Sequence, residues 1–159
     1  GELYTALQTG VIDATEWVGP YNDLAFGFQQ IAKYYYFPGW HEPGSMLEFI
    51  INLDAWNELP THLQSIVKTA AKAVNQDLLD EYTAMNNQAL RELIDVHNVQ
   101  LKKLPDDVIN EFRVISKSVL DEIAENDNQF KSIYESYLKF KSEVVGYHEI
   151  SEDAYTKIR

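Results

Sequence analysis

A carboxylate and a large aromatic side chain, Glu16 and Trp17, stand next to each other near the end of an apolar segment. Residues 11–18 are rich in apolar and β-branched side chains, and the breaker pair Gly19-Pro20 follows them. This pattern predicts a short strand that runs into a loop. In open α/β sheets, the end of a strand beside a loop and a helix start is the usual place for a ligand. On composition alone, the plainer interpretation makes Trp17 a core anchor and Glu16 a solvated or capping group.

A second group of residues whose side chains could do chemistry is Trp40-His41-Glu42, which lies between two Pro-Gly turn signals. These residues could form an acid–base pair or half of a metal site. Adjacent residues on an extended segment point to opposite faces, so His41 and Glu42 are poorly placed to share one ion. The other histidines lie in helical segments without the i, i+4 partner that a helical zinc site needs: His62, His97 and His148. We therefore do not expect a zinc enzyme.

Enzymatic function of any other kind would rest on isolated residues. The sequence contains no Gly-rich phosphate loop, no G-x-S-x-G elbow and no paired-carboxylate motif. It also has no cysteine, which excludes a cysteine nucleophile and thiolate metal sites. A lyase or hydrolase that uses Glu16 or His41 is the enzyme hypothesis that remains, and we expect no catalysis.

The charge balance argues against nucleic acid as a partner. The chain carries 25 acidic and 13 basic residues, a formal net charge of -12, so a polyanion meets net repulsion without a basic stripe to offset it. The tyrosines at 34–36 could form a stacking platform for nucleotides. Against this acidic background, packing in a strand explains them better.

The elements that must position these residues are short before residue 60. The first eight residues predict an amphipathic helix that is already under way at the first residue and stops at Gly10, as if an amino-terminal part were missing. Breakers and composition then predict three more elements: a helix over 20–32 that Gly27 weakens, a strand over 34–37 and a strand over 46–53.

Residues 60–98 predict one long helix. Neither glycine nor proline interrupts the segment after Pro60, and apolar residues recur at steps of three and four. Such a helix would be roughly 55 Å long, whereas a globule of this chain length is about 40 Å across. Such a helix either projects into solvent or runs as a spine along a body larger than this chain, and the near-continuous apolar stripe favours the second. After this helix in the sequence we expect a brief strand over 99–101. Three helices follow it: 106–123, 130–144 and a last short helix capped by Ser151.

Two motif blocks resemble a known family. Residues 8–20, with Gln8-Thr9-Gly10 and Glu16-Trp17-Val18-Gly19-Pro20, and residues 33–44, with Pro38-Gly39-Trp40-His41-Glu42-Pro43-Gly44, are similar to the DctP-type solute receptors of tripartite ATP-independent periplasmic (TRAP) transporters. The chain looks closest to the branch that binds α-keto and α-hydroxy acids. The likeness continues through the Leu59-Pro60 helix start and covers essentially all residues.

The resemblance implies a helix-rich α/β fold, part of a two-lobed periplasmic-binding-protein architecture with a few short strands. Members of the family are about twice as long, so residues 1–159 would be the carboxyl-terminal portion of a receptor. In that arrangement we expect three parts: 1–53 as a strand-rich segment of the ligand lobe, 60–98 as the helix between the lobes, and 99–159 as a short strand with the terminal helices.

The resemblance also implies a ligand site. In the family branch an arginine and a glutamine from the missing portion hold the ligand carboxylate, together with a cation. By position, the Glu16 side chain and the Trp17 carbonyl would hold that cation, Na⁺ or Ca²⁺, and Trp17, Tyr21, Trp40 and His41 would contact the ligand. Physical reasoning calls for a bridging cation or a basic group from elsewhere, because Lys33 is the only basic residue before Pro60, against eight acidic residues in the same segment. Oxygen ligands suit a hard ion.

We therefore expect an extracytoplasmic solute receptor in the periplasm that passes a small 2-oxo or 2-hydroxy acid to the membrane permease subunits of a TRAP transporter. The two lobes would close about hinge segments when the ligand bridges them. Apolar faces left uncovered on a partial chain should lead to self-association, as in a homodimer. The alternative from another class is a helical protein-interaction module without a small-molecule ligand.

Overall fold

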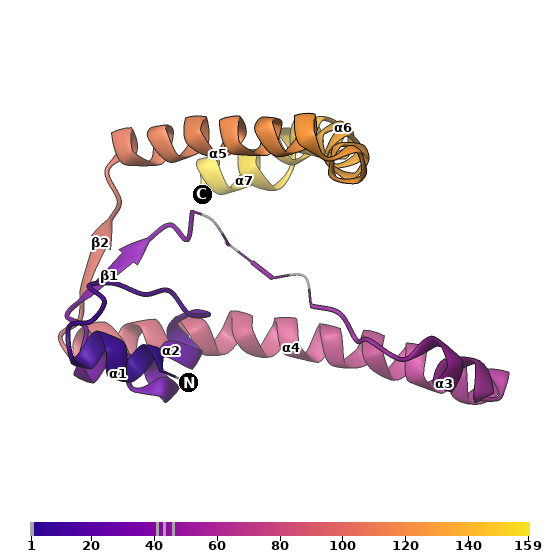
Figure 1. Cartoon of the computed structure of the whole chain (residues 1–159). Coiled ribbons are helices and arrows are strands. Elements are labelled where there is room, and N and C mark those ends of the chain that lie inside the picture. The colour runs from indigo at the N-terminus through magenta and orange to yellow at the C-terminus, as the bar shows by residue number, and fades with distance from the viewer. Residues whose placement is uncertain (1, 41, 43, 46) are drawn as a thin grey trace. The chain divides into compact units, whose positions relative to one another are not determined.

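The computed structural model describes residues 2–40, 42, 44–45 and 47–159, which fall into two units, Gly1–Leu104 and Pro105–Arg159. The fold is helix-rich with two short strands, as the sequence predicts (Figure 1). Its elements, in chain order, are α1 (Leu3–Gln8), α2 (Pro20–Phe26), the 3₁₀ helix η1 (Phe28–Gln30), β1 (Tyr34–Phe37), α3 (Leu53–Glu58), α4 (Thr61–Asp95), β2 (Gln100–Lys103), α5 (Asp106–Asn126), α6 (Asn128–Ile150) and α7 (Glu152–Ile158).

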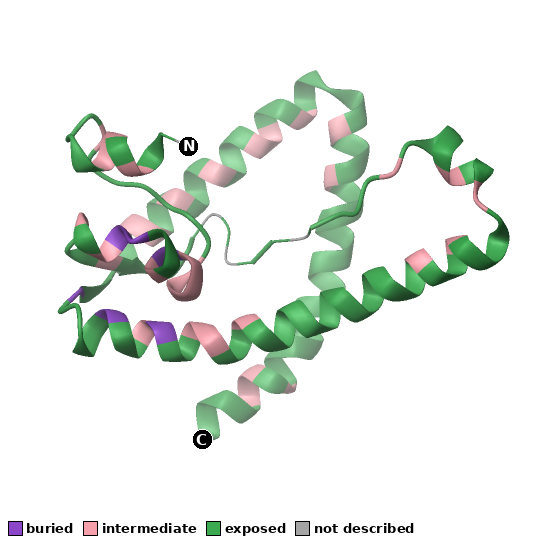
Figure 2. Cartoon of the chain, turned by 90° about the horizontal axis from the view of Figure 1, so that it is seen from below, coloured by how far each residue is buried: buried purple, intermediate pink, exposed green. Residues whose placement is uncertain are grey.

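The long helix α4 confirms the main structural prediction. It contains 35 residues, from Thr61 to Asp95, and is therefore about 52 Å long at 1.5 Å per residue. Figure 1 shows α3 at its N-terminal end and α2 beside its C-terminal half. Most of the helix surface between these two ends is exposed (Figure 2).

The strands β1 and β2 pair in parallel, with Tyr35 opposite Leu101. Both were predicted from sequence, although the second runs over 100–103 and not over 99–101. The pairing begins where the Gln100 N–H donates to the Lys33 carbonyl at 2.8 Å. Because α4 lies between the two strands in the sequence, the sheet ties the C-terminal end of α4 to the segment that follows α2.

Gly10 ends α1 as predicted, in a Schellman arrangement. Its φ is +74°, a backbone conformation that favours glycine. The Gly10 N–H donates to the Leu7 carbonyl at 3.3 Å, and the Val11 N–H donates to the Ala6 carbonyl at 2.9 Å.

Two predicted strands are wrong among the described residues. Residues 11–18 form no strand, and neither do residues 47–52; Met46 lies outside the described residues. A strand needs a neighbour that completes its hydrogen bonds, whereas the N–H groups of Val11 and Ile12 donate to the Ala6 carbonyl at the end of α1. The second apolar run ends at Asn52, whose side-chain Oδ1 caps α3 by accepting from the N–H groups of Asp54 and Ala55 at 3.0 and 3.1 Å.

Two local predictions also need correction. The helix that begins at Pro20 ends at Phe26 and does not continue through Ala32, because Gly27 has φ +86° and the chain then forms η1. Ser151 precedes α7 but does not cap it through its side chain. Its hydroxyl instead donates to carbonyls of α6, most closely to Tyr147 at 2.8 Å.

The small core of the first unit lies where α2, η1, the C-terminal part of α4 and the start of β2 meet (Figure 2). Its buried residues are Phe28, Ala89, Leu93, Val99 and the carboxylate Asp23. Leu93 is the most enclosed of them, with 2% of its surface exposed. Burying a carboxylate in a core this small costs free energy unless hydrogen bonds satisfy it, so Asp23 should have hydrogen-bond donors within reach.

The second unit consists of α5, α6 and α7. Residues 105–159 are all described and none of them is buried, so this unit has no enclosed core of its own. Its apolar side chains are exposed or half-buried, and Phe130 stacks on Tyr134 with ring centroids 5.7 Å apart. Within the described part of the chain, no helix combines the length and apolarity that a bilayer crossing requires.

Candidate ligand and cation site

The loop between α1 and α2 carries Glu16 and Trp17, and both residues are exposed. The Trp17 indole packs against Phe26 of α2, with ring centroids 5.2 Å apart. The next N–H along the chain, that of Val18, donates to Oδ1 of Asp23 at 3.3 Å. The Trp17 ring and the Val18 N–H therefore hold the loop against α2, while Glu16 and Trp17 both remain exposed.

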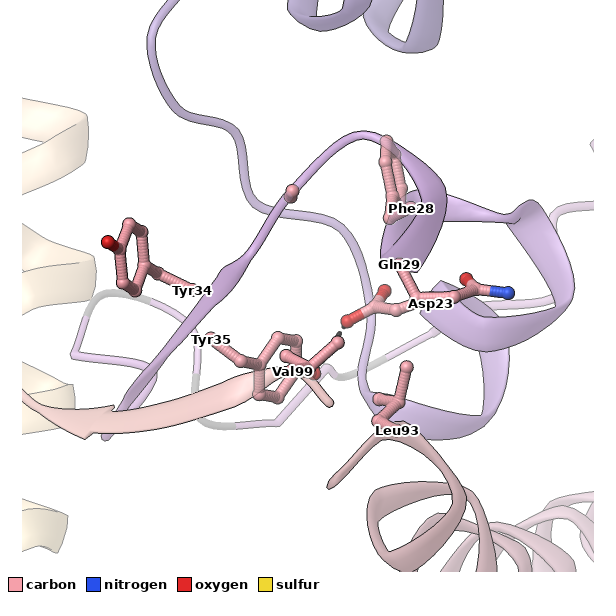
Figure 3. A pocket seen from close by; sticks show the side chains of 8 residues that line it. Asp23, Phe28, Gln29, Tyr34, Tyr35, Leu93 and Val99 are labelled. Atoms are coloured by element: carbon pink, nitrogen blue, oxygen red, sulfur yellow. Dashed lines mark hydrogen bonds between the residues drawn. The ribbon is translucent and has the colours of Figure 1, made fainter. Parts of the chain in front are cut away.

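Asp23 is held in turn by Tyr35 of β1. The Tyr35 hydroxyl donates to Oδ2 of Asp23 at 2.6 Å, and Figure 3 shows the two side chains pointing toward one another. Burial raises the pKa of the Tyr35 phenol well above its usual value, and the hydrogen bond to the Asp23 carboxylate raises it further. The phenol therefore stays neutral and remains a hydrogen-bond donor, so each oxygen of the buried carboxylate has a partner.

Asn86 of α4 anchors the other side of the loop. Its Oδ1 accepts a hydrogen bond from the Tyr21 N–H at 2.9 Å. The same oxygen would lie 3.1 Å from a Cβ placed on Gly19, so a side chain there would press against it. A single side chain from the long helix thus binds the start of α2 and leaves little room for a side chain at Gly19.

The residues that the sequence grouped as ligand contacts lie on different segments. Tyr21 turns toward α4, where its hydroxyl donates to Glu81 at 3.4 Å and its ring meets Tyr82 edge-on at 6.0 Å. Trp40, 45% exposed, lies on the segment after β1, and His41 lies outside the described residues. Glu16 and Trp17 share one loop. Ligand contacts by Tyr21, Trp40 and His41 stay predictions.

Two cavities in the first unit differ greatly in size. The smaller, of about 20 Å³, is lined by Asp23, Tyr35, Leu93 and neighbouring residues (Figure 3), and it has room for a water but not for an organic acid. The larger, about 470 Å³, is an open apolar groove against α3 and α4. Its only charged lining residue, Lys68, sits 5.4 Å from the Trp56 ring centre. Neither cavity includes Glu16 or Trp17.

The donor atoms on the loop fit part of the coordination sphere of a hard cation. A carboxylate and a backbone carbonyl are oxygen ligands of the kind that Ca²⁺ takes, usually six to eight at a time. Among the described residues, no group of three or more histidine or acidic side chains could hold a metal ion. Glu16 and Trp17 could therefore supply two ligands, and the others would be waters, ligand oxygens or groups from elsewhere.

Three residues that hold this loop are not among the sites predicted from sequence: Asp23, Tyr35 and Asn86. A signal existed for Asn86, which lies four residues after Tyr82 and three before Ala89, so it is a polar side chain on the apolar face of the helix. For Tyr35 the signal was weaker: successive side chains of a strand lie on opposite faces, so Tyr35 is separated from Tyr34 and Tyr36. Nothing in the sequence marked Asp23 as buried.

The loop anchor on α4 can be tested through stability. Asn86→Ala leaves the Tyr21 N–H without its acceptor, and we expect it to lower the free energy of unfolding by about 1 kcal/mol. The measurement is the midpoint of urea unfolding. Asn87→Ala is the matched control, since Asn87 is exposed and only accepts a 3.3 Å bond from Arg91 on the same helix. Equal effects of the two substitutions would contradict the assigned role of Asn86.

A helix-rich α/β chain with a long spine helix, a parallel strand pair and an exposed carboxylate–carbonyl loop has the features of a bacterial solute-binding protein. The chain belongs to the DctP family, bacterial extracellular solute-binding protein family 7, whose model matches residues 1–127. It is 39% identical over 155 residues to a monocarboxylate 2-oxoacid-binding periplasmic protein of Nostoc sp., an alignment that covers 98% of this chain and 42% of the relative.

A solved structure agrees with this assignment. The fold matches a TRAP transporter solute-binding protein from Bordetella bronchiseptica with a TM-score of 0.91 and 34% identity, over 99% of this chain and 47% of the other. The crystals of that protein contain a mixed-occupancy dimer, in which one active site holds copurified calcium and picolinate and the other is in the apo form. The chain thus spans less than half the length of both relatives.

Proposed function

We propose that this chain is the carboxyl-terminal portion of a TRAP-transporter solute receptor that binds a small 2-oxo or 2-hydroxy acid through a bridging cation. The observation that carries the proposal is the loop with the exposed residues Glu16 and Trp17, whose next peptide N–H, that of Val18, is bound by the buried side chain of Asp23. Membership in a solute-binding family supports the receptor role, and the 2-oxoacid-binding relative supports the ligand class.

The charge of the chain supports a bridging cation or a basic group from elsewhere as the partner of the acid. Lys33 is the only basic residue before Pro60, so the carboxylate of an organic acid would be repelled by this surface alone. A cation held by Glu16 and the Trp17 carbonyl would give the acid a positive partner. Na⁺ and Ca²⁺ both suit such oxygen ligands, and the calcium in the Bordetella protein favours Ca²⁺.

In this proposal Trp17, Tyr21, Trp40 and His41 contact the ligand, and the lobes of the complete receptor close around it with α4 as the spine. No bond is made or broken in the ligand, so the protein acts in the periplasm as a carrier to the permease subunits and not as an enzyme. The apolar surfaces that this chain leaves exposed would be covered by the remainder of the receptor or by a second copy in a homodimer.

A thermal-shift experiment on the complete receptor tests the proposal. We expect 2-oxo acids to raise the melting temperature in the presence of Ca²⁺ or Na⁺ and to have little effect after chelation and desalting. An acid present at a hundred times its Kd should stabilise the folded state by about 2.7 kcal/mol. If no carboxylic acid raises the melting temperature under either condition, the result favours the helical interaction module. In that module the exposed apolar side chains of α5 and α6 would be the binding surface.

A further expected result concerns the chain of 159 residues by itself. It should bind 2-oxo acids weakly or not at all, because it lacks the basic groups that hold the ligand carboxylate. Titration calorimetry with pyruvate and longer 2-oxo acids, with Ca²⁺ present, should show no micromolar binding. A tight, stoichiometric isotherm would contradict the claim that the rest of the receptor supplies half of the site.

A further inference from the structure

The hydrogen bond from Val18 to Asp23 has a consequence for the atom that the proposed function assigns to the cation. Trp17 and Val18 are joined by one peptide unit, which is trans, since the single cis bond among the described residues is Phe37-Pro38. In a planar trans peptide the N–H and the C=O point in opposite directions. Asp23, by binding the Val18 N–H at 3.3 Å, therefore sets the direction of the Trp17 carbonyl.

That direction leads away from the core. Asp23 is buried, with 7% of its surface exposed, and lies below the loop in the region that Tyr35, Leu93 and Val99 surround. The Trp17 carbonyl oxygen consequently points away from this region. A hydrogen bond from the N–H of a peptide to a carboxylate also polarises the peptide, which strengthens its carbonyl oxygen as a cation ligand.

Tyr35 holds the Asp23 side chain in the orientation that lets it bind the Val18 N–H. A carboxylate on a seven-residue helix has several rotamers. The 2.6 Å hydrogen bond from the Tyr35 hydroxyl (Figure 3) favours the one in which Oδ1 accepts from the Val18 N–H. Tyr35 is itself fixed by the parallel pairing of β1 with β2. A series of contacts thus leads from the sheet, through Tyr35 and Asp23, to the peptide unit that joins Trp17 and Val18.

We propose that Asp23 and Tyr35 are positioning residues, which orient the Trp17 carbonyl as a cation ligand without touching the cation themselves. This inference rests on the proposed function. It assigns a reason for the only buried carboxylate among the described residues, which otherwise weakens a small core. Partners of this kind, one step removed from the ligands, commonly change metal affinity by about 10- to 100-fold when they are removed.

The test uses Tb³⁺ as a luminescent substitute for Ca²⁺ in the complete receptor, excited through tryptophan. Titration gives the cation affinity, and emission lifetimes in H₂O and D₂O give the number of bound waters. We expect Asp23→Ala to lower the affinity by roughly 10- to 100-fold and to add about one bound water, because water replaces the carbonyl that has turned away. Asp23→Asn keeps an acceptor for the Val18 N–H and should restore the parent's water count.

Tyr35→Phe and Tyr36→Phe form a matched pair on one strand. Tyr35 binds Asp23, whereas Tyr36 is 55% exposed. Removing the Tyr35 hydroxyl should reduce the affinity about tenfold and raise the water count, and removing that of Tyr36 should change neither. If Asp23→Ala does not fold, the tyrosine pair decides the matter, since Phe retains the ring and its packing.

Glu16→Gln separates failure of this inference from failure of the proposed function. If Glu16→Gln weakens Tb³⁺ binding while Asp23→Ala and Tyr35→Phe keep the parent's affinity and water count, the positioning role is overturned and the cation site stands. If Glu16→Gln leaves Tb³⁺ binding unchanged as well, the cation site itself is wrong, and the positioning role falls with it.

Discussion

Replacing Glu16 with glutamine should reduce the affinity of the complete receptor for its organic acid by roughly a hundredfold, which corresponds to about 3 kcal/mol. The substitution keeps the size and shape of the side chain and removes its charge. A cation bound by Glu16 and the Trp17 carbonyl would then face a neutral amide, which is a weaker ligand. Because the cation in turn holds the acid, the affinities for the cation and for the acid should fall together.

The measurement is a ligand titration of parent and variant over a range of Ca²⁺ and Na⁺ concentrations. Glu58→Gln is the matched control, because Glu58 is an exposed glutamate at the end of α3, far along the chain from the loop. It should bind like the parent. If the Glu16 variant also binds like the parent and keeps the same dependence on cations, the assignment of Glu16 as a metal ligand is wrong.

Leu93→Ala should lower the free energy of unfolding by about 2–5 kcal/mol, the largest stability effect that we expect in this chain. Leu93 is only 2% exposed and lies around one small cavity with Phe28 of η1, Tyr35 of β1 and Val99. Truncating it removes buried apolar surface and enlarges the small cavity of about 20 Å³ that it already lines next to Asp23. The core has few other buried residues, so little can move in to fill the space.

Urea or thermal unfolding of the protein measures this effect. Leu79→Ala on the same helix is the control, since Leu79 is 61% exposed and its truncation should cost less than about 1 kcal/mol. A loss of stability at Leu93 no greater than that at Leu79 would show that the meeting point of α2, α4 and β2 is not the core of the first unit. The Glu16 and Leu93 predictions are independent, because the first concerns an exposed loop and the second an enclosed side chain.

The long helix was predictable from sequence because its signal is local and repeated. Residues 61–95 carry apolar side chains at steps of three and four without a glycine or proline, and a helix satisfies its own backbone hydrogen bonds. The same holds for Gly10 as the stop of α1 and for the helices that follow Pro105 and Asp127. At these positions no distant part of the chain has to cooperate.

Strands behave differently, because their hydrogen bonds are completed by other segments. The tyrosine-rich run at 34–37 became β1 because residues 100–103 pair with it. The equally apolar runs at 11–18 and 47–52 found no such partner within the described chain and remained irregular. Their composition alone could not distinguish these outcomes.

The candidate site divides along the same line. The sequence by itself determined the acidic character of the chain, the absence of enzyme motifs, the long helix and the neighbouring pair Glu16-Trp17, because these are properties of composition and of adjacent residues. Only the tertiary structure decided that Tyr35 of β1 binds Asp23 of α2, which binds the Val18 N–H of this loop, and that Asn86 of α4 binds the Tyr21 N–H after it. The physical reason is that a buried carboxylate and a backbone N–H are satisfied by whichever groups the packing brings within reach, and that choice is made by contacts between residues up to 65 positions apart.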